Sequence, residues 1–128
     1  AEYDRYGIVA GEVVDDSILR VAQIDEKPGK EAARSDLASV SGYLFEPSIL
    51  TYLEKASAEY QEGGEFMIQP VIQQMIDDGH SFYAREIVDG TYYDTGDKLE
   101  YLKTVIDFGL KHEEFGDSLR AHLEHRLK

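Results

Sequence analysis

The sequence predicts an α/β fold in which helices pack on a mixed β-sheet. Two runs rich in β-branched residues, 6–14 and 18–24, are typical of strands. From residue 47 onward, apolar residues recur at spacings of three and four positions, as they do in helices. Hydrophobic residues make up 42% of the 128 positions and charged residues 30%, which is the balance of a globular chain. We therefore expect a single domain, residues 1–128.

The N-terminal third is predicted to consist of strands and one loop. Residues 6–14 and 18–24 flank a short polar turn and predict a hairpin. Residues 26–36 hold a proline and a glycine among charged side chains and predict a loop. Residues 37–45 are partly apolar on both alternating faces, so they predict a third strand that is covered on both sides.

Two helices are expected next, and they are the elements that would cover the sheet. Pro47 suits the first turn of a helix, and the apolar positions of that helix recur up to Glu59. Pro70 marks the beginning of the second helix, and Gly79 is placed to end it.

The remaining elements are a second hairpin and two closing helices. Residues 81–88 and 91–94 flank Asp89 and Gly90, a dipeptide that suits a tight hairpin turn. A helix over residues 98–110 then follows directly from the strand at 91–94. The last helix carries a thinner apolar stripe, formed by Leu119, Leu123 and Leu127.

The composition excludes several classes of function. A formal net charge of -13 repels phosphate backbones and anionic lipid headgroups, so we expect neither nucleic acid nor a membrane as partner. The sequence has no cysteine and therefore no disulfide or thiolate chemistry. No apolar run approaches the roughly 18 residues of a membrane span, and we expect the cytoplasm. The chain opens on AEYDRYGIV, without a methionine, and we expect it to be part of a longer protein.

Two aspartates surround Gly96 where an aromatic run gives way to a helix. Glu100 follows Asp97 at the spacing of a capping box, so we interpret Asp97 as the cap of that helix. Asp94 ends the predicted strand, at the kind of position where open α/β sheets bind ligands. From the residues alone, a structural role of Asp94 is as well supported as a metal or substrate role.

A second candidate site ends the second predicted strand, at Asp25, Glu26, Lys27 and Pro28. An acid beside a lysine is most often a solvated ion pair, and from the residues alone that interpretation is favoured. The alternative is that Glu26 accepts hydrogen bonds from sugar hydroxyls while Lys27 offers a point charge to a phosphate.

Two further motifs are weaker. The GGE motif at residues 63–65 lacks the lysine and hydroxyl of a phosphate-binding loop and is interpreted as a turn. His122 and His125 have the spacing of metal ligands on a helix, but no third ligand is near in the sequence, and we interpret them as exposed.

Several motifs in this order resemble the C-terminal half of bacterial UTP–glucose-1-phosphate uridylyltransferases, also called UDP-glucose pyrophosphorylases. They are RYGIV at 5–9, EKP at 26–28, LA at 37–38 with Tyr43, GGE at 63–65, and YDTGDKL at 93–99 running into YLK at 101–103. The resemblance implies the C-terminal part of a doubly wound nucleotide-diphospho-sugar transferase fold. It also implies a reaction in which glucose 1-phosphate attacks the α-phosphorus of UTP, with Mg2+ assisting and pyrophosphate leaving.

The resemblance assigns expected roles to four residues. Gly7 and Glu26 would contact the glucose, and Lys27 would contact its phosphate as the catalytic residue of this chain. Asp94 matches the carboxylate near the catalytic metal in related sugar nucleotidyltransferases. UTP would be held mainly by the N-terminal half of the full enzyme, and a homo-oligomer is expected.

The departures from the family leave an alternative open. The family's glycine-rich nucleotide-binding segment and first metal-binding aspartate are not in this sequence. Ser39, Ser41 and Gly42 replace the family's apolar residue, glycine and arginine, and FMIQP at 66–70 replaces a run containing threonine and aspartate. We therefore expect the isolated chain to be inactive. The alternative is a non-catalytic module for sugar-phosphate binding or oligomerisation.

Overall fold

A computed structural model describes residues 3–40, 42–61 and 64–128. The chain divides into two compact units, Ala1–Val88 and Asp89–Lys128, and each is described by itself. The single domain that the sequence predicts therefore stays a prediction. Within the described residues, none of the helices combines the length and the apolar character that crossing a membrane requires.

The first unit is built on the predicted N-terminal hairpin, which is confirmed. Strand β1 (Gly7–Asp15) pairs antiparallel with strand β2 (Ile18–Glu26). The register shifts at Gly11, where Ala22 is the extra residue of a β-bulge. A Cβ on Gly11 would collide with the carbonyl oxygen of Arg20, so this bulge requires a glycine.

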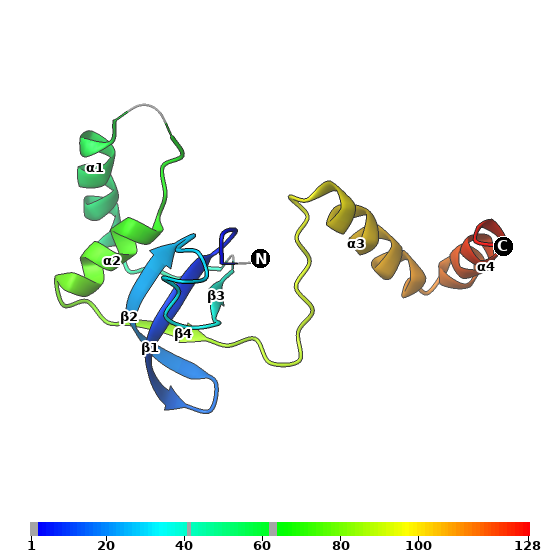
Figure 1. Cartoon of the computed structure of the whole chain (residues 1–128), viewed down its shortest axis with the longest axis horizontal. Coiled ribbons are helices and arrows are strands. Elements are labelled where there is room, and N and C mark those ends of the chain that lie inside the picture. Colours follow the sequence, from blue (N-terminus) through cyan, green and yellow to red (C-terminus); the bar gives the residue numbers. More distant parts are fainter. Residues whose placement is uncertain (1–2, 41, 62–63) are drawn as a thin grey trace. The chain divides into compact units, whose positions relative to one another are not determined.

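Two short strands complete the sheet and lie on opposite edges of the hairpin (Figure 1). Strand β3 (Ala38–Ser39) pairs with β1, and strand β4 (Phe82–Arg85) pairs with β2. Within the described residues the strand order is β3-β1-β2-β4, and every pair is antiparallel rather than mixed. The helices described below complete the α/β class, which is confirmed.

The third strand is much shorter than the sequence predicts for residues 37–45. Only two residues form strand, because the register places Ser39 opposite Gly7, and residues 3–6 before it are in turns and a bend. Among the residues that the structure describes, none forms a strand beside 42–45. At its other end, the contact between β1 and β3 continues to Leu37, whose carbonyl accepts from the amide of Val9 at 3.0 Å.

Both helices of the first unit lie near their predicted positions. Helix α1 (Ile49–Glu59) follows Pro47, and helix α2 (Gln69–Asp77) has Pro70 in its first turn. Gly79 ends α2 with a positive φ of 96°, as expected for a glycine there. Helix α2 is buried on two sides. Its Ile72 joins the sheet residues Val9, Leu19, Val21 and Ile24, while its Val71 and Met75 pack with Ile49 of α1.

Helix α1 is also tied to the end of α2 by hydrogen bonds. The hydroxyl of Tyr52 donates to Oδ2 of Asp78 at 2.8 Å, and the side-chain amide of Gln74 donates to Oδ1 at 2.9 Å. These two hydrogen bonds lower the pKa of the Asp78 carboxyl, the one from Tyr52 most. Gln74 is therefore engaged at the exposed face of α2.

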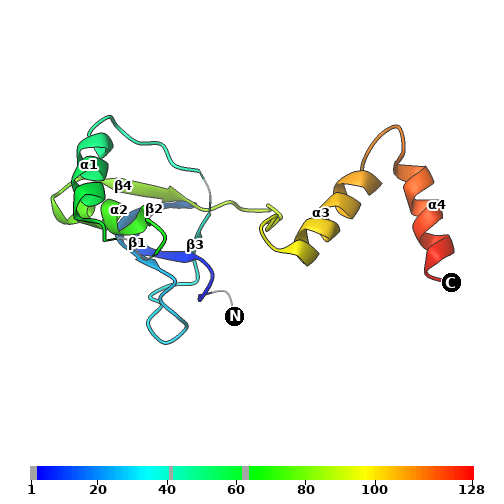
Figure 2. The same cartoon turned by 90° about the horizontal axis from the view of Figure 1, so that it is seen from above.

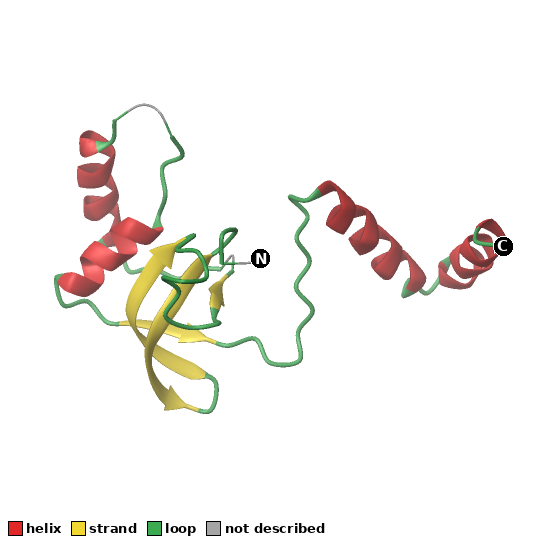
Figure 3. Ribbon diagram, viewed as in Figure 1, coloured by secondary structure: helices red, strands yellow, loops and turns green. Residues whose placement is uncertain are grey.

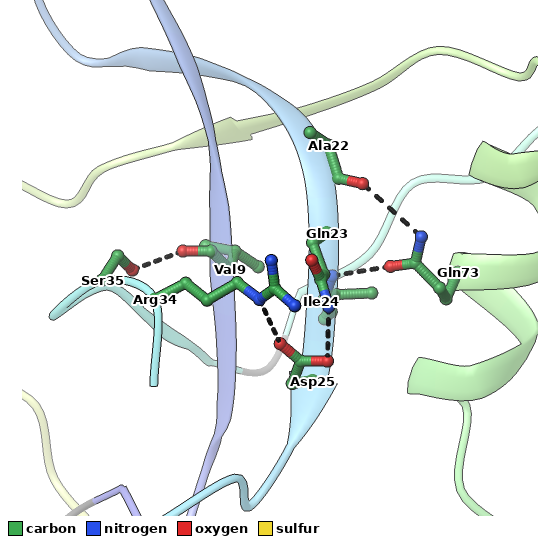
Figure 4. A network of polar contacts seen from close by, with 8 residues as sticks. All are labelled: Val9, Ala22, Gln23, Ile24, Asp25, Arg34, Ser35 and Gln73. Atoms are coloured by element: carbon green, nitrogen blue, oxygen red, sulfur yellow. Dashed lines mark hydrogen bonds and ion pairs between the residues drawn. The ribbon is translucent and has the colours of Figure 1, made fainter. Parts of the chain in front are cut away.

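Gln73 connects α2 to an open stretch of strand edge (Figure 4). Strand β4 pairs with β2 only as far as Val21, so no described strand lies beside the next residues of β2 on that side. The side chain of Gln73 takes the place of the missing strand. Its Oε1 accepts from the Ile24 amide at 2.9 Å, and its Nε2 faces the Ala22 carbonyl at 3.5 Å. One side-chain amide thus satisfies backbone groups that a neighbouring strand would otherwise pair.

The second predicted hairpin does not form, and this prediction was wrong. Within the described residues, strand β4 covers only 82–85 of the expected 81–88, and 91–94 carry no strand (Figure 3). The type I′ turn that an Asp-Gly dipeptide favours needs a positive φ at both central residues. Asp89 has one, at 60°, but Gly90 does not, so these two residues do not form that turn.

The second unit consists of the two closing helices, which are confirmed. Helix α3 (Lys98–Leu110) and helix α4 (Gly116–Arg126) follow one another through a short connection (Figure 2). A Cβ on Gly109 of α3 would stand 2.6 Å from Leu119 of α4. A larger residue at this position would require the end of the Leu119 side chain to shift.

We expect the Gln73→Ala variant to unfold more easily. Ile24 is only 5% exposed, so its amide would lose an acceptor that water cannot readily replace. The free energy of unfolding, measured with urea, should fall by about 1–3 kcal/mol.

Gln74→Ala is the matched control for that variant. It removes the same side chain from the next position of α2, but there the amide donates to an exposed carboxylate. Its effect should stay within about 0.5 kcal/mol, as for most surface substitutions. Equal losses for the two variants would contradict the role given to Gln73.

Candidate functional site

A pocket of about 340 Å³ lies where β1 begins and β2 ends. It is lined by residues 5–7, by Glu26 and Lys27, by Ser39 of β3, and by residues 65–69 leading into α2. The structure therefore brings together Gly7, Glu26 and Lys27, the three site residues of this unit that the resemblance singles out.

Glu26 is one of the polar residues that line this pocket. Its Oε1 lies 3.4 Å from Nζ of Lys27, while its Oε2 is buried and has no hydrogen-bond partner within the described residues. The side chain as a whole is 18% exposed. A buried carboxylate oxygen without a partner carries a desolvation cost that a bound hydroxyl group would relieve.

Gly7 lies close against that oxygen. A Cβ at this position would stand 3.2 Å from Oε2 of Glu26, 3.3 Å from Cγ of Gln69 and 3.4 Å from Nε2 of Gln69, all at or below the lower limit of ordinary van der Waals contact. Any side chain here would press against Glu26 and Gln69. Glycine therefore allows the carboxylate and the amide to lie this close to the backbone of β1.

Lys27 leaves the strand in an unusual backbone conformation. Its φ is +47°, in the left-handed region that residues other than glycine seldom occupy. Its amide still donates to the carbonyl of Tyr6 at 3.2 Å. Its side chain is 42% exposed. The ammonium group is thus anchored beside Glu26 while remaining accessible to a ligand at the mouth of the pocket.

Asp25 does not take part in this pocket, although the sequence places it in the same motif. Alternation along β2 turns its side chain to the other face, where Oδ1 accepts from Gln23 at 3.0 Å and Oδ2 lies 3.8 Å from Nε of Arg34 (Figure 4). Of the two neighbouring acids, only Glu26 faces the pocket.

The pocket also contains polar residues that the sequence did not identify as site residues. Arg5 adds a second cation, with its guanidinium carbon 5.7 Å from the centre of the Tyr6 ring. Gln69 adds a side-chain amide. The sequence held a signal for Gln69, because positions 69, 72, 73 and 76 lie on one face of a helix and two of them, Gln69 and Gln73, are polar.

The two aspartates around Gly96 have different local roles. Asp97 caps α3 as predicted, since its Oδ1 accepts from the amides of Leu99 at 2.9 Å and Glu100 at 3.0 Å. Asp94 accepts from the amide of Gly96 at 3.0 Å, in the turn before the helix. Asp94 belongs to the second unit, so its role in the site stays a prediction.

The described residues contain no cluster of three or more acidic, histidine or cysteine side chains that could hold a metal ion. His122 and His125 are exposed on α4. Of the remaining motif residues, Gly63 and Ser41 lie outside the described residues. A second hollow of similar volume, lined by Ser17 and residues 85–88, contains none of the predicted site residues.

The sequence matches a family model described as nucleotidyl transferase over residues 1–108. It is 37% identical over 124 residues to a UTP–glucose-1-phosphate uridylyltransferase of Streptococcus pneumoniae, a match that covers 95% of this chain and 40% of the relative. A uridylyltransferase of the same name from Staphylococcus epidermidis is 32% identical over 120 residues, again covering 40% of the relative and 94% of this chain. The chain thus spans two fifths of the length of these relatives.

Solved structures give the same result for the fold. The UTP-bound UGPase from Acinetobacter baumannii superposes with a TM-score of 0.76 at 31% identity, covering 98% of this chain and 41% of that one. A UDP-glucose pyrophosphorylase complexed with UDP-glucose superposes with a TM-score of 0.75 at 25% identity, covering 87% and 40%.

We expect Asp97→Ala to destabilise α3, because two amides of its first turn would lose their acceptor. Hydrogen exchange of the α3 amides should show a loss of about 0.5–2 kcal/mol of protection, as for other lost caps. Asp97→Asn keeps a capping oxygen and should retain most of the protection. Unchanged exchange in the alanine variant would show that the cap is dispensable.

Proposed function

Because the chain belongs to the nucleotidyl transferase family, we propose that it supplies the sugar-phosphate side of an enzyme that transfers a uridylyl group from UTP to glucose 1-phosphate. UDP-glucose and pyrophosphate are the products. The observation that carries this proposal is the pocket in which Glu26 presents a buried, unpartnered carboxylate oxygen beside the accessible ammonium of Lys27. The similarity to uridylyltransferases over nearly the whole chain supports it.

The geometry suits the two ends of a sugar phosphate. The carboxylate of Glu26 accepts hydrogen bonds from sugar hydroxyls in the pocket that it lines together with Gly7. Lys27, with Arg5 in the same pocket, offers positive charge to the phosphate. These local cations are needed, since a chain with a formal charge of -13 otherwise repels an anionic substrate.

In the proposed reaction, an oxygen of the sugar phosphate attacks the α-phosphorus of UTP. A new phosphorus–oxygen bond forms, and the bond to the β-phosphate breaks and releases pyrophosphate. The part of this chain is to hold the attacking phosphate in a fixed direction. Positioning of this kind supplies a large share of the rate in such transfers.

We propose Mg2+ as the metal of the complete enzyme, with Asp94 as the residue of this chain near it. The described residues do not form a metal site by themselves, because no three ligating side chains gather. Asp94 would contribute one carboxylate, and the other ligands and most contacts to UTP would come from outside this sequence. We place the complete enzyme in the cytoplasm as a homo-oligomer.

We expect no pyrophosphate release when the 128-residue chain is incubated with UTP, Mg2+ and glucose 1-phosphate. A chimera in which the chain replaces the matched segment of the Streptococcus pneumoniae relative should release it. In that chimera, Lys27→Ala should lower kcat/KM at least about tenfold, which is the loss of one charge-assisted contact. Asp94→Ala should mainly lower kcat.

Two outcomes would contradict this function. Pyrophosphate release by the isolated chain at the rate of the chimera would show that it is not one side of a larger site. A folded chimera that binds glucose 1-phosphate without releasing pyrophosphate would favour the non-catalytic module instead.

A further inference from the structure

Gln69 is the first residue of α2 and lines the pocket. Its Nε2 and Oε2 of Glu26 both lie within 3.4 Å of the point where a Cβ of Gly7 would stand. No hydrogen bond engages the Gln69 side chain within the described residues. An amide and a carboxylate of the pocket lining therefore approach the same point of the Gly7 backbone.

The two groups differ in what they offer a ligand. An ionised carboxylate only accepts hydrogen bonds, whereas a side-chain amide both donates and accepts. Glu26 alone cannot distinguish one hydroxyl that donates to it from another. An N–H donor beside it adds a second condition, because a hydroxyl oxygen must stand where it can accept from Gln69.

The position of Gln69 is fixed by the strand edge. Gln73 lies one helical turn further along α2 on the same side, and its amide is bonded to the Ile24 backbone at 2.9 Å. Ile72, between them in sequence, is 2% exposed in the core against the sheet. The first turn of α2 is therefore held against the end of β2, and Gln69 has a fixed place from which to contact a ligand.

We propose that Gln69 is a specificity-determining residue that recognises one ring hydroxyl of a hexose 1-phosphate, next to the hydroxyl that Glu26 accepts. The ligand class is a pyranose 1-phosphate that carries hydroxyls on neighbouring ring carbons. This inference rests on the proposed function, since it assigns a further contact in the same pocket. A sugar that lacks the recognised hydroxyl leaves the amide unpaired and binds more weakly.

The test measures binding to the whole 128-residue chain by ligand-observed NMR. The probes are α-D-glucose 1-phosphate, its 2-deoxy, 3-deoxy and 4-deoxy analogues, galactose 1-phosphate and inorganic phosphate. The variant is Gln69→Met, which keeps the length of the side chain and removes its hydrogen bonds. Gln74→Ala, on the same helix but with its amide bonded to Asp78, is the control.

For the unmodified chain, we expect one deoxy analogue to bind roughly 3- to 10-fold more weakly than glucose 1-phosphate through loss of the Gln69 contact. Gln69→Met should weaken glucose 1-phosphate by the same factor and leave that analogue unchanged. The same variant should leave inorganic phosphate unaffected. The Gln74→Ala chain should behave as the unmodified one does.

The other outcomes overturn the inference at different levels. If Gln69→Met weakens the binding of every ligand equally, inorganic phosphate included, Gln69 does not recognise the sugar. The same follows if the variant weakens the binding of none. In both cases the proposed function stands. If the unmodified chain binds glucose 1-phosphate no better than inorganic phosphate, the sugar-phosphate pocket itself is refuted, and the role of Gln69 falls with it.

Discussion

The hydrogen bond between the Ile24 amide and the side chain of Gln73 is the contact on which the arrangement of the first unit depends. Strand β2 is longer than its neighbour β4, so part of its edge would be left unpaired against the interior. A helix can dock there only if it brings polar groups that match the strand. Gln73 does so, and the docking buries Ile72 and places Gln69 at the pocket. Core packing and site geometry thus share one support.

The pocket combines two features that lower the stability of the fold unless a bound ligand compensates for them. Lys27 occupies the left-handed region of backbone space, and Oε2 of Glu26 is buried without a partner. Such features tend to gather at functional sites, where binding repays their cost. In the pocket that they line, they favour a ligand that brings hydroxyl groups and a negative charge. A sugar phosphate has both.

The sequence predicted those elements whose signals are local. The β-branched runs, Pro70 and the Asp97 cap each act within a few residues, and the hairpin and helices are found where expected. The strand predicted at 37–45 forms only at 38–39 within the described residues, because a strand needs a partner and the partner is set by distant parts of the chain. The strand predicted at 91–94 does not form, because Asp89 and Gly90 do not adopt the local turn that was expected of them. Glu26 and Lys27 could be predicted from a motif. Gln69 was missed because its role depends on where α2 docks against the sheet.

The central claim is that the end of the β1–β2 hairpin binds a sugar phosphate, and amide chemical shifts test it most directly. In a titration of the ¹⁵N-labelled chain with glucose 1-phosphate, the account predicts saturable shifts of the Gly7, Glu26, Lys27 and Gln69 amides. The amides of Ser17 and residues 85–88, around the second hollow, should stay unchanged. Shifts confined to that second hollow would contradict the account. So would the absence of shifts at the hairpin end when both inorganic phosphate and the sugar phosphate are in large excess.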